Sequence, residues 1–358
     1  MGRRFEPLWA HFYAIVRSVD KPNLPNNFHV LFKQGGSKLR ILVTGGAGYI
    51  GSVAVALLME KGYQVTVLDD ISTGHIESIP EGARFVRGSL LDQDNILNAL
   101  EGCTAVLHFA GKSLVGESAE KPDLYQDVNV NGSKNLLVQM RSKNVKKLIF
   151  SSSAATYGEV DLNPISENSK TSPTNPYGST KLQVEELISK ECAEHGLSAV
   201  SLRYFNVAGA LKTQNGWLAE KHDPETHLIP NILKSSEENP VRVFGTDWPT
   251  YDGTCIRDYV HVIDLVEAHV LALLSLVEPG HKIYNLGSGR GYSVKEVIAA
   301  SDKATGKSTP YVSEVRRSGD PAILIADIAK VKRELGWAPI RGIQEMVADA
   351  YRSTEAFF

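Results

Sequence analysis

The chain is poor in the features that mark secreted, metal-clustered or membrane proteins. Its 358 residues include only three cysteines, Cys103, Cys192 and Cys255, which are too far apart for a CxxC pair or a metal-ligand spacing. No apolar run approaches the ~20 residues of a membrane span. The net charge is only −3, which argues against nucleic acid or an anionic membrane as the main partner. We therefore expect a cytoplasmic protein with reduced thiols and no metal, nucleic-acid or membrane partner.

Residues 1–38 do not share the pattern of the rest of the chain. Arg3 and Arg4 resemble the start of a signal peptide, but His11 and Arg17 interrupt the apolar region and no small-residue cleavage site follows. We therefore predict an N-terminal extension that is poorly ordered.

From residue 39 onward, apolar strands alternate with helical segments. The predicted strands are 39–44, 64–69, 83–86, 105–110, 147–152 and 199–205, and the predicted helices are 49–61, 92–100, 123–143 and 176–195. This alternation predicts an α/β fold with a Rossmann-type doubly wound parallel sheet.

The regularity fades after Asn206, although residues 264–277 and 292–305 again have helical spacing. We predict a dinucleotide-binding domain over residues 39–206. Residues 207–358 are predicted to form mainly a smaller mixed α/β substrate domain, with segments near 258–276 returning to the first domain.

A glycine-rich loop joins the first predicted strand to its helix. Gly45, Gly48 and Gly51 fit the pattern G-x-x-G-x-x-G, and the start of the following helix presents free N–H groups to a pyrophosphate. Asp69 ends the second strand eighteen residues after Gly51, where an acid accepts hydrogen bonds from the adenosine ribose. Because this carboxylate repels a 2′-phosphate, the sequence predicts NAD rather than NADP as the cofactor.

Tyr177 and Lys181 lie four residues apart in a helical segment that begins at Pro176. Residues at this spacing share one face of a helix, so a phenol and an ammonium lie side by side. A nearby positive charge favours the phenolate, and we expect the pKa of Tyr177 to fall well below its usual value of about 10. Such a tyrosine could act as a general base for a sugar or alcohol hydroxyl. The same spacing also occurs in many helices that carry no chemistry.

Ser153 follows the fifth predicted strand, at the edge of the sheet where open α/β folds bind ligands. Its hydroxyl could exchange a hydrogen bond with a substrate oxygen near Tyr177. The alternative is a serine-rich turn that only caps the strand.

These motifs together resemble the extended short-chain dehydrogenase/reductase family, and within it the UDP-glucose 4-epimerases. The resemblance covers about residues 39–355. Beyond the three motifs above, it extends through residues 108–111, 115–118, 203–206, 252–259, 284–287 and 316–320.

The resemblance implies an NAD-dependent 4-epimerase of UDP-hexoses that interconverts UDP-glucose and UDP-galactose. Tyr177 would remove the proton from the sugar 4-hydroxyl while hydride passes from C4 to NAD, and Ser153 would hydrogen-bond the 4-oxygen. Lys181 would lower the pKa of Tyr177 and hold the nicotinamide ribose. The 4-keto sugar would then turn over and take hydride on its other face. The family also implies a homodimer formed through helices near 123–143 and 176–195.

The resemblance further implies two sets of binding residues. The cofactor set is Gly45, Gly48, Tyr49, Ile50, Gly51, Asp69, Ser89, Leu90, Phe109, Ala110, Gly111, Asn129, Tyr177, Lys181 and Phe205. The substrate set is Ser153, Tyr177, Asn206, His227, Leu228, Val243, Phe244, Gly245, Arg257, Arg317, Asp320 and Leu324. Asn206, Arg257 and Arg317 are expected at the diphosphate. Asp320 is expected at the ribose and residues 243–245 at uracil.

The chain departs from the family pattern in ways that leave the substrate open. Ser89 stands where many relatives have an acid, and His227 stands where some have asparagine. Leu324 occupies a position where relatives carry tyrosine or a small cysteine, so the fit of an N-acetyl group is undecided. A 4-epimerase of UDP-arabinose, UDP-xylose, UDP-N-acetylglucosamine or UDP-glucuronate therefore stays an alternative.

Two other functions are disfavoured. Dehydration of a sugar nucleotide needs a carboxyl group after Ser153, but Ala154 and Ala155 follow it, and neither transfers a proton. A module that senses NAD or a nucleotide sugar without turnover is the remaining alternative. Such modules often lack the tyrosine or the lysine, and this chain has both Tyr177 and Lys181.

Overall fold

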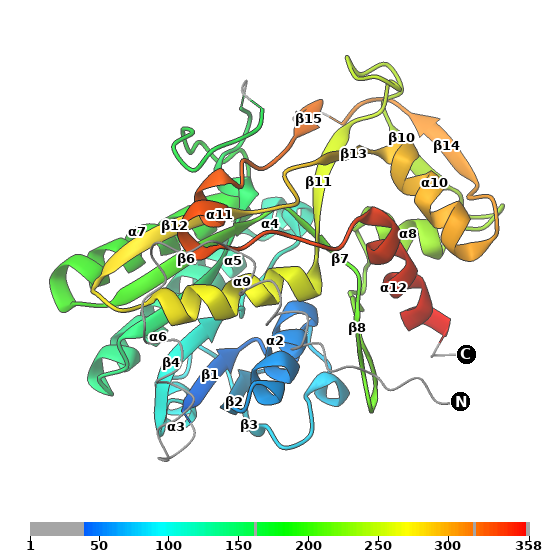
Figure 1. Ribbon diagram of the computed structural model, residues 1–358. Coiled ribbons are helices and arrows are strands. Elements are labelled where there is room, and N and C mark those ends of the chain that lie inside the picture. Colours follow the sequence, from blue (N-terminus) through cyan, green and yellow to red (C-terminus); the bar gives the residue numbers. More distant parts are fainter. Residues whose placement is uncertain (1–38, 161–162, 318–319, 356–358) are drawn as a thin grey trace. The chain divides into compact units, whose positions relative to one another are not determined.

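The computed structural model describes residues 39–160, 163–317 and 320–355 (Figure 1). The predicted N-terminal extension, residues 1–38, lies outside the described residues. The strands are β1 (Arg40–Thr44), β2 (Gln64–Asp69), β3 (Arg84–Arg87), β4 (Cys103–His108), β5 (Lys147–Ser153), β6 (Ser198–Tyr204), β7 (Asn206–Ala208), β8 (Leu211–Thr213), β9 (Gly216–Leu218), β10 (Val241–Phe244), β11 (Ile256–His261), β12 (Gly280–Leu286), β13 (Gly291–Ser293), β14 (Tyr311–Glu314) and β15 (Ile323–Leu324).

The α-helices are α2 (Tyr49–Glu60), α3 (Gln93–Ala99), α4 (Val115–Glu120), α5 (Pro122–Tyr125), α6 (Gly132–Ser142), α7 (Pro176–His195), α8 (Leu228–Leu233), α9 (Val262–Ser275), α10 (Val294–Thr305), α11 (Ala329–Leu335) and α12 (Ile343–Glu355). Two short 3₁₀ turns, η2 (Ile76–Ser78) and η4 (Ala154–Thr156), and a π-helical segment, η3 (Gln126–Asn131), complete the set.

The main sheet has seven strands in the order β12-β6-β5-β4-β1-β2-β3. All six neighbouring pairs are parallel. From β1 the chain first adds β2 and β3 on one side of the sheet. It then crosses to the other side of β1, where β4, β5 and β6 follow in order. The strand order therefore reverses beside β1. This arrangement confirms the predicted doubly wound α/β fold, and open sheets of this kind bind ligands at the point of reversal.

Helices cover both faces of this sheet. Successive residues of a strand point to opposite faces, so neighbouring residues of β1 pack against different helices. Ile41 and Val43 of β1 pack with residues of α2, α9 and α11 on one face. Leu42 packs with residues of α3, α6 and α7 on the other. Figure 1 shows α2 and α9 side by side. Because the central strands are buried on both faces, their sequences are nearly continuous apolar runs.

The bounds of α7 follow from local sequence signals. Asn175 is the N-cap, and its side-chain oxygen accepts a hydrogen bond from Gly178 N at 2.8 Å. Pro176 occupies the first turn, where its missing N–H costs nothing. Gly196 ends the helix with φ of 69°, a left-handed conformation that glycine adopts without strain.

The predicted single helix over residues 123–143 is wrong in detail. The described structure there consists of α5, the π-helical η3 and then α6. A π segment inserts one residue into the helical repeat, and nothing in the hydrophobic pattern of the sequence distinguishes it from α-helix.

The second half of the chain both builds a smaller unit and returns to the main sheet. The strand pairs β10–β14 and β11–β13 pack with α8, α10 and α12 around a separate cluster that includes Val243, Tyr292 and Met346. In contrast, β12 is the edge strand next to β6, and α9 packs against α2. The domain boundary at residue 206 stays a prediction, because the described residues from 39 onward form one compact unit.

Candidate functional site

The ends of the central strands open onto a cavity of about 1030 Å³. Its walls include Gly45 after β1, Asp69 at the end of β2, Phe109 after β4 and Ser153 at the end of β5. Ligand pockets typically measure about 300–1,000 Å³, so this cavity has room for a large, composite ligand. Its position is the one at which parallel α/β sheets bind nucleotides.

Two glycines, one in the loop after β1 and one in the first turn of α2, leave no space for a side chain. Gly45 has φ of +70°, and a Cβ there would lie 2.6 Å from the backbone nitrogen of Ala110. A Cβ on Gly51 would lie 2.0 Å from the carbonyl oxygen of Gly45. Gly48 is the N-cap of α2 and has no side-chain cap. The first N–H groups of α2 are therefore available to an anion such as a pyrophosphate.

Asp69 is held by the backbone at the end of β2. Its two carboxylate oxygens accept hydrogen bonds from Ala47 N at 3.0 Å and Ile71 N at 2.9 Å. Burial raises the pKa of Asp69, while these two N–H groups lower it. Each carboxylate oxygen has a second lone pair, so the fixed carboxylate can still accept from a ribose hydroxyl.

Nearly all other predicted cofactor residues line the same cavity. They are Gly48, Tyr49, Ile50, Gly51, Ser89, Leu90, Phe109, Ala110, Gly111, Tyr177, Lys181 and Phe205. Asn129 does not line it. Its amide donates to Lys112 O at 3.0 Å and to Thr180 Oγ1 at 3.0 Å, and accepts from Lys112 N at 2.7 Å. Asn129 therefore fixes the loop after β4 against α7, and its contact with the cofactor stays a prediction.

The predicted catalytic residues meet at one wall of the cavity. Tyr177 and Lys181 lie one turn apart on α7, and Ser153 ends β5. The Lys181 ammonium lies 5.8 Å from the centre of the Tyr177 ring and donates to Ser151 O at 2.8 Å. Ser153 lies close enough to the Tyr177 phenol to lower its pKa. The three side chains thus present a hydroxyl pair and a fixed cation to the cavity.

The predicted lowering of the Tyr177 pKa is wrong for this structure. Burial raises the pKa of Tyr177, and the hydrogen bond with Ser153 offsets part of that rise. Burial also lowers the pKa of Lys181 to about 8, an effect that Glu185 partly opposes. Desolvation disfavours the charged form of each group, and helical spacing reveals nothing about burial.

A buried ion pair beneath the catalytic wall was not predicted. Glu185, on the same helix as Lys181, lies 2.6 Å from Arg203 of β6, and both side chains are only 4% exposed. Glu185 also accepts from Ser152 Oγ at 2.6 Å. This network joins α7 to β5 and β6, so it fixes the helix that carries Tyr177 relative to the strand that carries Ser153.

A second cavity of about 600 Å³ adjoins the first. Five predicted substrate residues line both cavities: Asn206, His227, Arg257, Arg317 and Asp320. Leu228, Val243 and Phe244 line the second cavity, and Leu324 lines the first. Gly245 lines neither; a Cβ there would lie 2.3 Å from Trp248 Nε1. Its backbone N–H donates to Glu314 O, at the end of β14, at 2.8 Å.

Two arginines stand where the cavities join. Arg257 Nη1 donates to Pro321 O at 2.8 Å, and Arg257 Nη2 lies 3.7 Å from Asp320 Oδ1. The Arg317 guanidinium lies 3.7 Å from the centre of the Phe244 ring. Guanidinium groups match the geometry of phosphates, so this junction is suited to a diphosphate lying between the two cavities.

The cavity also includes residues that the sequence analysis did not identify. Glu220, His222, Glu225 and Thr226 line it between β9 and α8. Their signal in the sequence is the polar run from 220 to 227, in which acids and histidines recur at short intervals. That run lies in the irregular part of the chain, where spacing predicts no common face.

Comparison with known proteins gives consistent matches over most of the chain. The model of the NAD dependent epimerase/dehydratase family matches residues 41–287. A UDP-glucose 4-epimerase of Corynebacterium glutamicum is 49% identical over 321 residues, which are 89% of this chain and 96% of that protein.

Solved structures match as well. The UDP-glucose 4-epimerase of Brucella ovis in complex with NAD has a TM-score of 0.84 at 42% identity, covering 88% of this chain and 98% of that one. The UDP-glucose 4-epimerase of Bifidobacterium longum in complex with NAD⁺ and UDP has a TM-score of 0.82 at 37% identity, covering 88% of this chain and 98% of that one.

Proposed function

The chain belongs to the NAD dependent epimerase/dehydratase family, and we propose that it is an NAD-dependent 4-epimerase of UDP-hexoses. It interconverts UDP-glucose and UDP-galactose through a 4-keto sugar. One observation carries this proposal: Tyr177, Ser153 and Lys181 face the same cavity as the glycine loop and Asp69. The identity to the UDP-glucose 4-epimerase of C. glutamicum supports it independently.

The cavity fits NAD. The contacts of Gly45 and Gly51 allow only glycine, and the open start of α2 suits a pyrophosphate. Asp69 suits the adenosine ribose, with Ser89 and Leu90 near the adenine and Phe109 to Gly111 beside the nicotinamide half. Bound NAD supplies the acceptor and donor of the C4 hydride.

Tyr177 is the proposed acid and base. Its Oη takes the proton of the sugar 4-hydroxyl and returns it to the same oxygen after the sugar has turned over. Ser153 hydrogen-bonds the 4-oxygen and keeps it beside Tyr177. Burial opposes an isolated charge on either Tyr177 or Lys181. A Tyr177 phenolate is therefore favoured only while Lys181 is protonated, because the ammonium then offsets its negative charge.

The arginines at the junction of the cavities are the proposed anchors of the diphosphate. Arg257 and Arg317 supply positive charge, and Asn206 supplies an amide. Asp320 is proposed to accept from the nucleoside ribose, while Val243 and Phe244 are proposed to cradle uracil in the second cavity. His227, Leu228 and Leu324 complete the walls around the diphosphate and the sugar.

The same geometry disfavours a sugar-nucleotide dehydratase. Ala154 and Ala155 occupy the short η4 turn directly after Ser153, so no carboxyl group stands there to protonate a leaving hydroxyl. What distinguishes the alternative substrates from UDP-glucose and UDP-galactose lies at C2 or C6, whereas inversion at C4 is the same reaction for all of them. A 4-epimerase of UDP-N-acetylglucosamine or a UDP-pentose therefore uses the same catalytic groups and is the second candidate.

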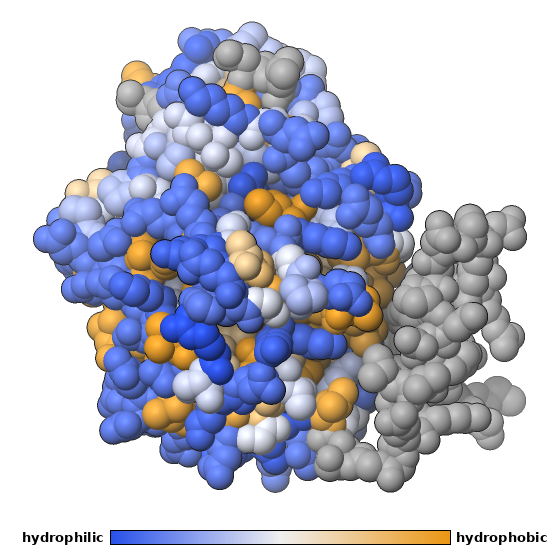
Figure 2. Space-filling model, turned by 90° about the vertical axis from the view of Figure 1, so that its left-hand side faces the viewer, coloured by the Kyte–Doolittle hydropathy of each residue, from blue (hydrophilic) through white to orange (hydrophobic). Residues whose placement is uncertain are grey.

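We also propose that the protein is a homodimer formed through η3, α6 and α7. These helices pack on one another on one side of the main sheet. Figure 2 views the side on which Figure 1 draws α6 and α7, and shows separate hydrophobic patches within a hydrophilic surface. Sedimentation equilibrium should give twice the chain mass. A monomer at micromolar concentration would refute the proposal.

A cytoplasmic location is proposed on the basis of the thiols. Cys103, Cys192 and Cys255 are all free, as expected in a reducing compartment. Within the described part of the chain, none of the helices combines the length and apolarity that crossing a bilayer requires.

The activity is tested by offering UDP-glucose, UDP-N-acetylglucosamine and UDP-xylose in parallel and following the products by NMR. We expect inversion at C4 of UDP-glucose without net consumption of NAD. Products of dehydration, or no product from any of the three sugars, would contradict the proposed function. Faster turnover of one of the other sugars would favour the second candidate.

A further inference from the structure

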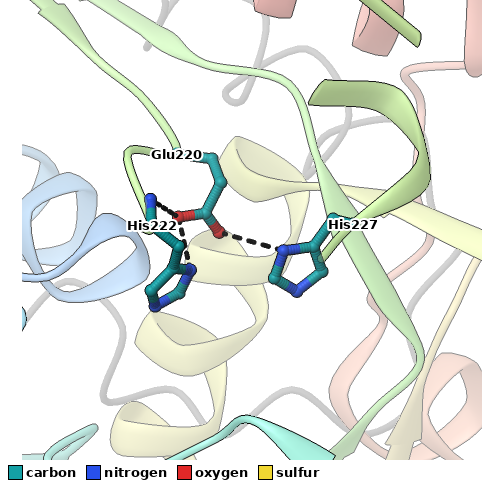
Figure 3. Close-up of side chains that lie close together, drawn as sticks. All are labelled: Glu220, His222 and His227. Carbon is teal, nitrogen blue, oxygen red and sulfur yellow. Dashed lines mark hydrogen bonds and ion pairs between the residues drawn. The ribbon is translucent and has the colours of Figure 1, made fainter. Parts of the chain in front are cut away.

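A compact group of nitrogen and oxygen donors lies between β9 and α8. The sequence from 220 to 227 is Glu-x-His-x-x-Glu-x-His. Glu220, His222 and His227 each offer one ligand atom, and these atoms all lie within 4.8 Å of one another. Figure 3 shows the Glu220 carboxylate between the two imidazole rings. His222 Nδ1 lies 2.7 Å from Glu220 Oε1, and His227 Nδ1 lies 3.9 Å from Glu220 Oε2.

We propose that Glu220, His222 and His227 bind a divalent transition-metal ion of the zinc class. In a tetrahedral zinc site with bonds of about 2.0–2.2 Å, the ligand atoms stand about 3.3 Å apart. His222 Nδ1 and Glu220 Oε1 lie 2.7 Å apart, and the three ligand atoms all lie within 4.8 Å of one another, so side-chain rotations can bring them to that spacing. Two imidazoles and one carboxylate favour zinc or cobalt over calcium and magnesium, which prefer all-oxygen ligands.

A second observation points to a ligand at this place. His222 Nδ1 and one oxygen of Glu225 are buried and have no hydrogen-bond partner within the described residues. Buried polar atoms are normally satisfied, and the Glu225 side chain is only 6% exposed. His222 Nδ1 is paired with Glu220 Oε1, 2.7 Å away, and Glu220 is itself one of the proposed ligands. An ion between these two side chains would satisfy the imidazole nitrogen.

Glu225 is suited to position one of the ligands rather than to bind the ion itself. Its Oε1 accepts from the backbone N–H of His227 at 2.7 Å and lies 2.8 Å from His227 Nδ1. A carboxylate on one ring nitrogen of a metal-binding histidine commonly fixes the ring while the other nitrogen binds the ion, so His227 would bind through Nε2. The backbone also contributes, because His227 is the N-cap of α8.

The ion would tie a cavity wall together. Glu220 and His222 follow β9, whereas His227 begins α8, so shared coordination closes the irregular segment between them. All three residues line the cavity that also contains Asp69 and Tyr177. The proposed ion therefore acts on the shape of that wall and takes no part in the proton transfer at Tyr177. It departs from the sequence analysis, which predicted no metal.

Metal binding can be measured on the full chain without any affinity tag. Protein freed of metal by a chelator is titrated with Zn²⁺ by calorimetry and with Co²⁺ by visible absorption. We expect one ion per chain, Co²⁺ bands of tetrahedral intensity and a higher melting temperature with Zn²⁺. His222→Gln and Glu220→Gln should each weaken binding by at least about tenfold. The matched control is His195→Gln, an exposed histidine at the end of α7, which should bind as the unmodified protein does.

Two results would overturn the proposal. The first is the absence of stoichiometric binding and of Co²⁺ bands in the unmodified protein, which by itself decides the matter. The second is equal binding by the unmodified protein and by the His222→Gln, Glu220→Gln and His195→Gln variants, which would assign the ion to other histidines. Circular dichroism checks that each variant is folded, and the cobalt spectrum of the unmodified protein decides the outcome if a variant is not.

Discussion

The Lys181 ammonium lies 5.8 Å from the centre of the Tyr177 ring while it donates a hydrogen bond of 2.8 Å to the carbonyl oxygen of Ser151. The lysine is therefore fixed by the end of β5 and acts on the phenol through space. Because Ser153 belongs to the same strand end, one short stretch of β5 positions both the cation and the hydroxyl that face Tyr177.

Tyr177→Phe should abolish most of the turnover while leaving NAD bound. General acid–base catalysis by one side chain contributes about 100- to 10,000-fold, and the phenyl ring keeps the packing. Turnover is measured by the conversion of UDP-galactose and retention of NAD by absorbance after denaturation. Tyr311→Phe, at an exposed tyrosine outside both cavities, is the control. A variant at residue 177 that is nearly as fast as the unmodified protein would refute the base assignment.

Lys181→Met should shift the activity profile to higher pH. The proposed base works as a phenolate, so the rate rises with pH as Tyr177 loses its proton. Removing the neighbouring cation raises the pKa of that phenol further above its already raised value. The part of the kcat–pH profile in which the rate rises should therefore shift to higher pH. Lys190→Met, at an exposed lysine of the same helix, should leave the profile in place. An unmoved limb in Lys181→Met would count against the electrostatic role.

Asp69→Ala should weaken NAD retention by at least about tenfold, since a hydrogen bond to a charged group contributes about 1.5–3 kcal/mol. Equilibrium dialysis of NAD measures the effect. Asp70→Ala removes the same charge from the next residue, which is exposed, and should have a smaller effect. Equal losses of NAD binding in the two variants would show that the negative charge of the region matters, and not a hydrogen bond from Asp69 to the ribose. Equal binding of NADP by the unmodified protein would contradict the cofactor preference.

Glu185→Gln should destabilise the fold strongly. Its buried partner Arg203 would be left without a counter-charge, and breaking such a pair costs about 3–5 kcal/mol. Urea unfolding measures this cost. Glu194→Gln, at an exposed acid of the same helix, should change the free energy of unfolding by no more than about 0.5 kcal/mol. The double variant Glu185→Gln/Arg203→Met should lose less than the sum of the single losses. Strict additivity would show that the two side chains are not coupled.

Much of the fold follows from local sequence signals. The predicted bounds of β2 and α7 agree with the structure, because β2 is an apolar run and α7 is bounded by Pro176 and Gly196. The glycine loop and Asp69 were predictable for the same reason: their spacing belongs to a single βαβ unit. Membership of the predicted family is confirmed by the family match.

The remainder depends on contacts between distant segments. The raised pKa of Tyr177 arises from burial, which no helical spacing reveals. The pair of Glu185 and Arg203 joins a helix to a neighbouring strand, and each residue alone reads as an ordinary surface charge. The convergence of Glu220, His222 and His227 arises in irregular chain, where neither a period of 3.6 nor one of 2 applies.

The position of β12 at the outer edge of the main sheet has a practical consequence for protein engineering. Residues 280–286 complete the sheet beside β6, although the chain builds β10 and β11 before it reaches them. A fragment that stops after Tyr204 would expose the hydrogen-bonding groups of a fully buried strand, and such naked edges promote aggregation. A chimaera designed to take substrate specificity from a homologue should therefore replace only the segments before and after residues 262–286. Residues 262–286 themselves should come from the same protein as the main sheet.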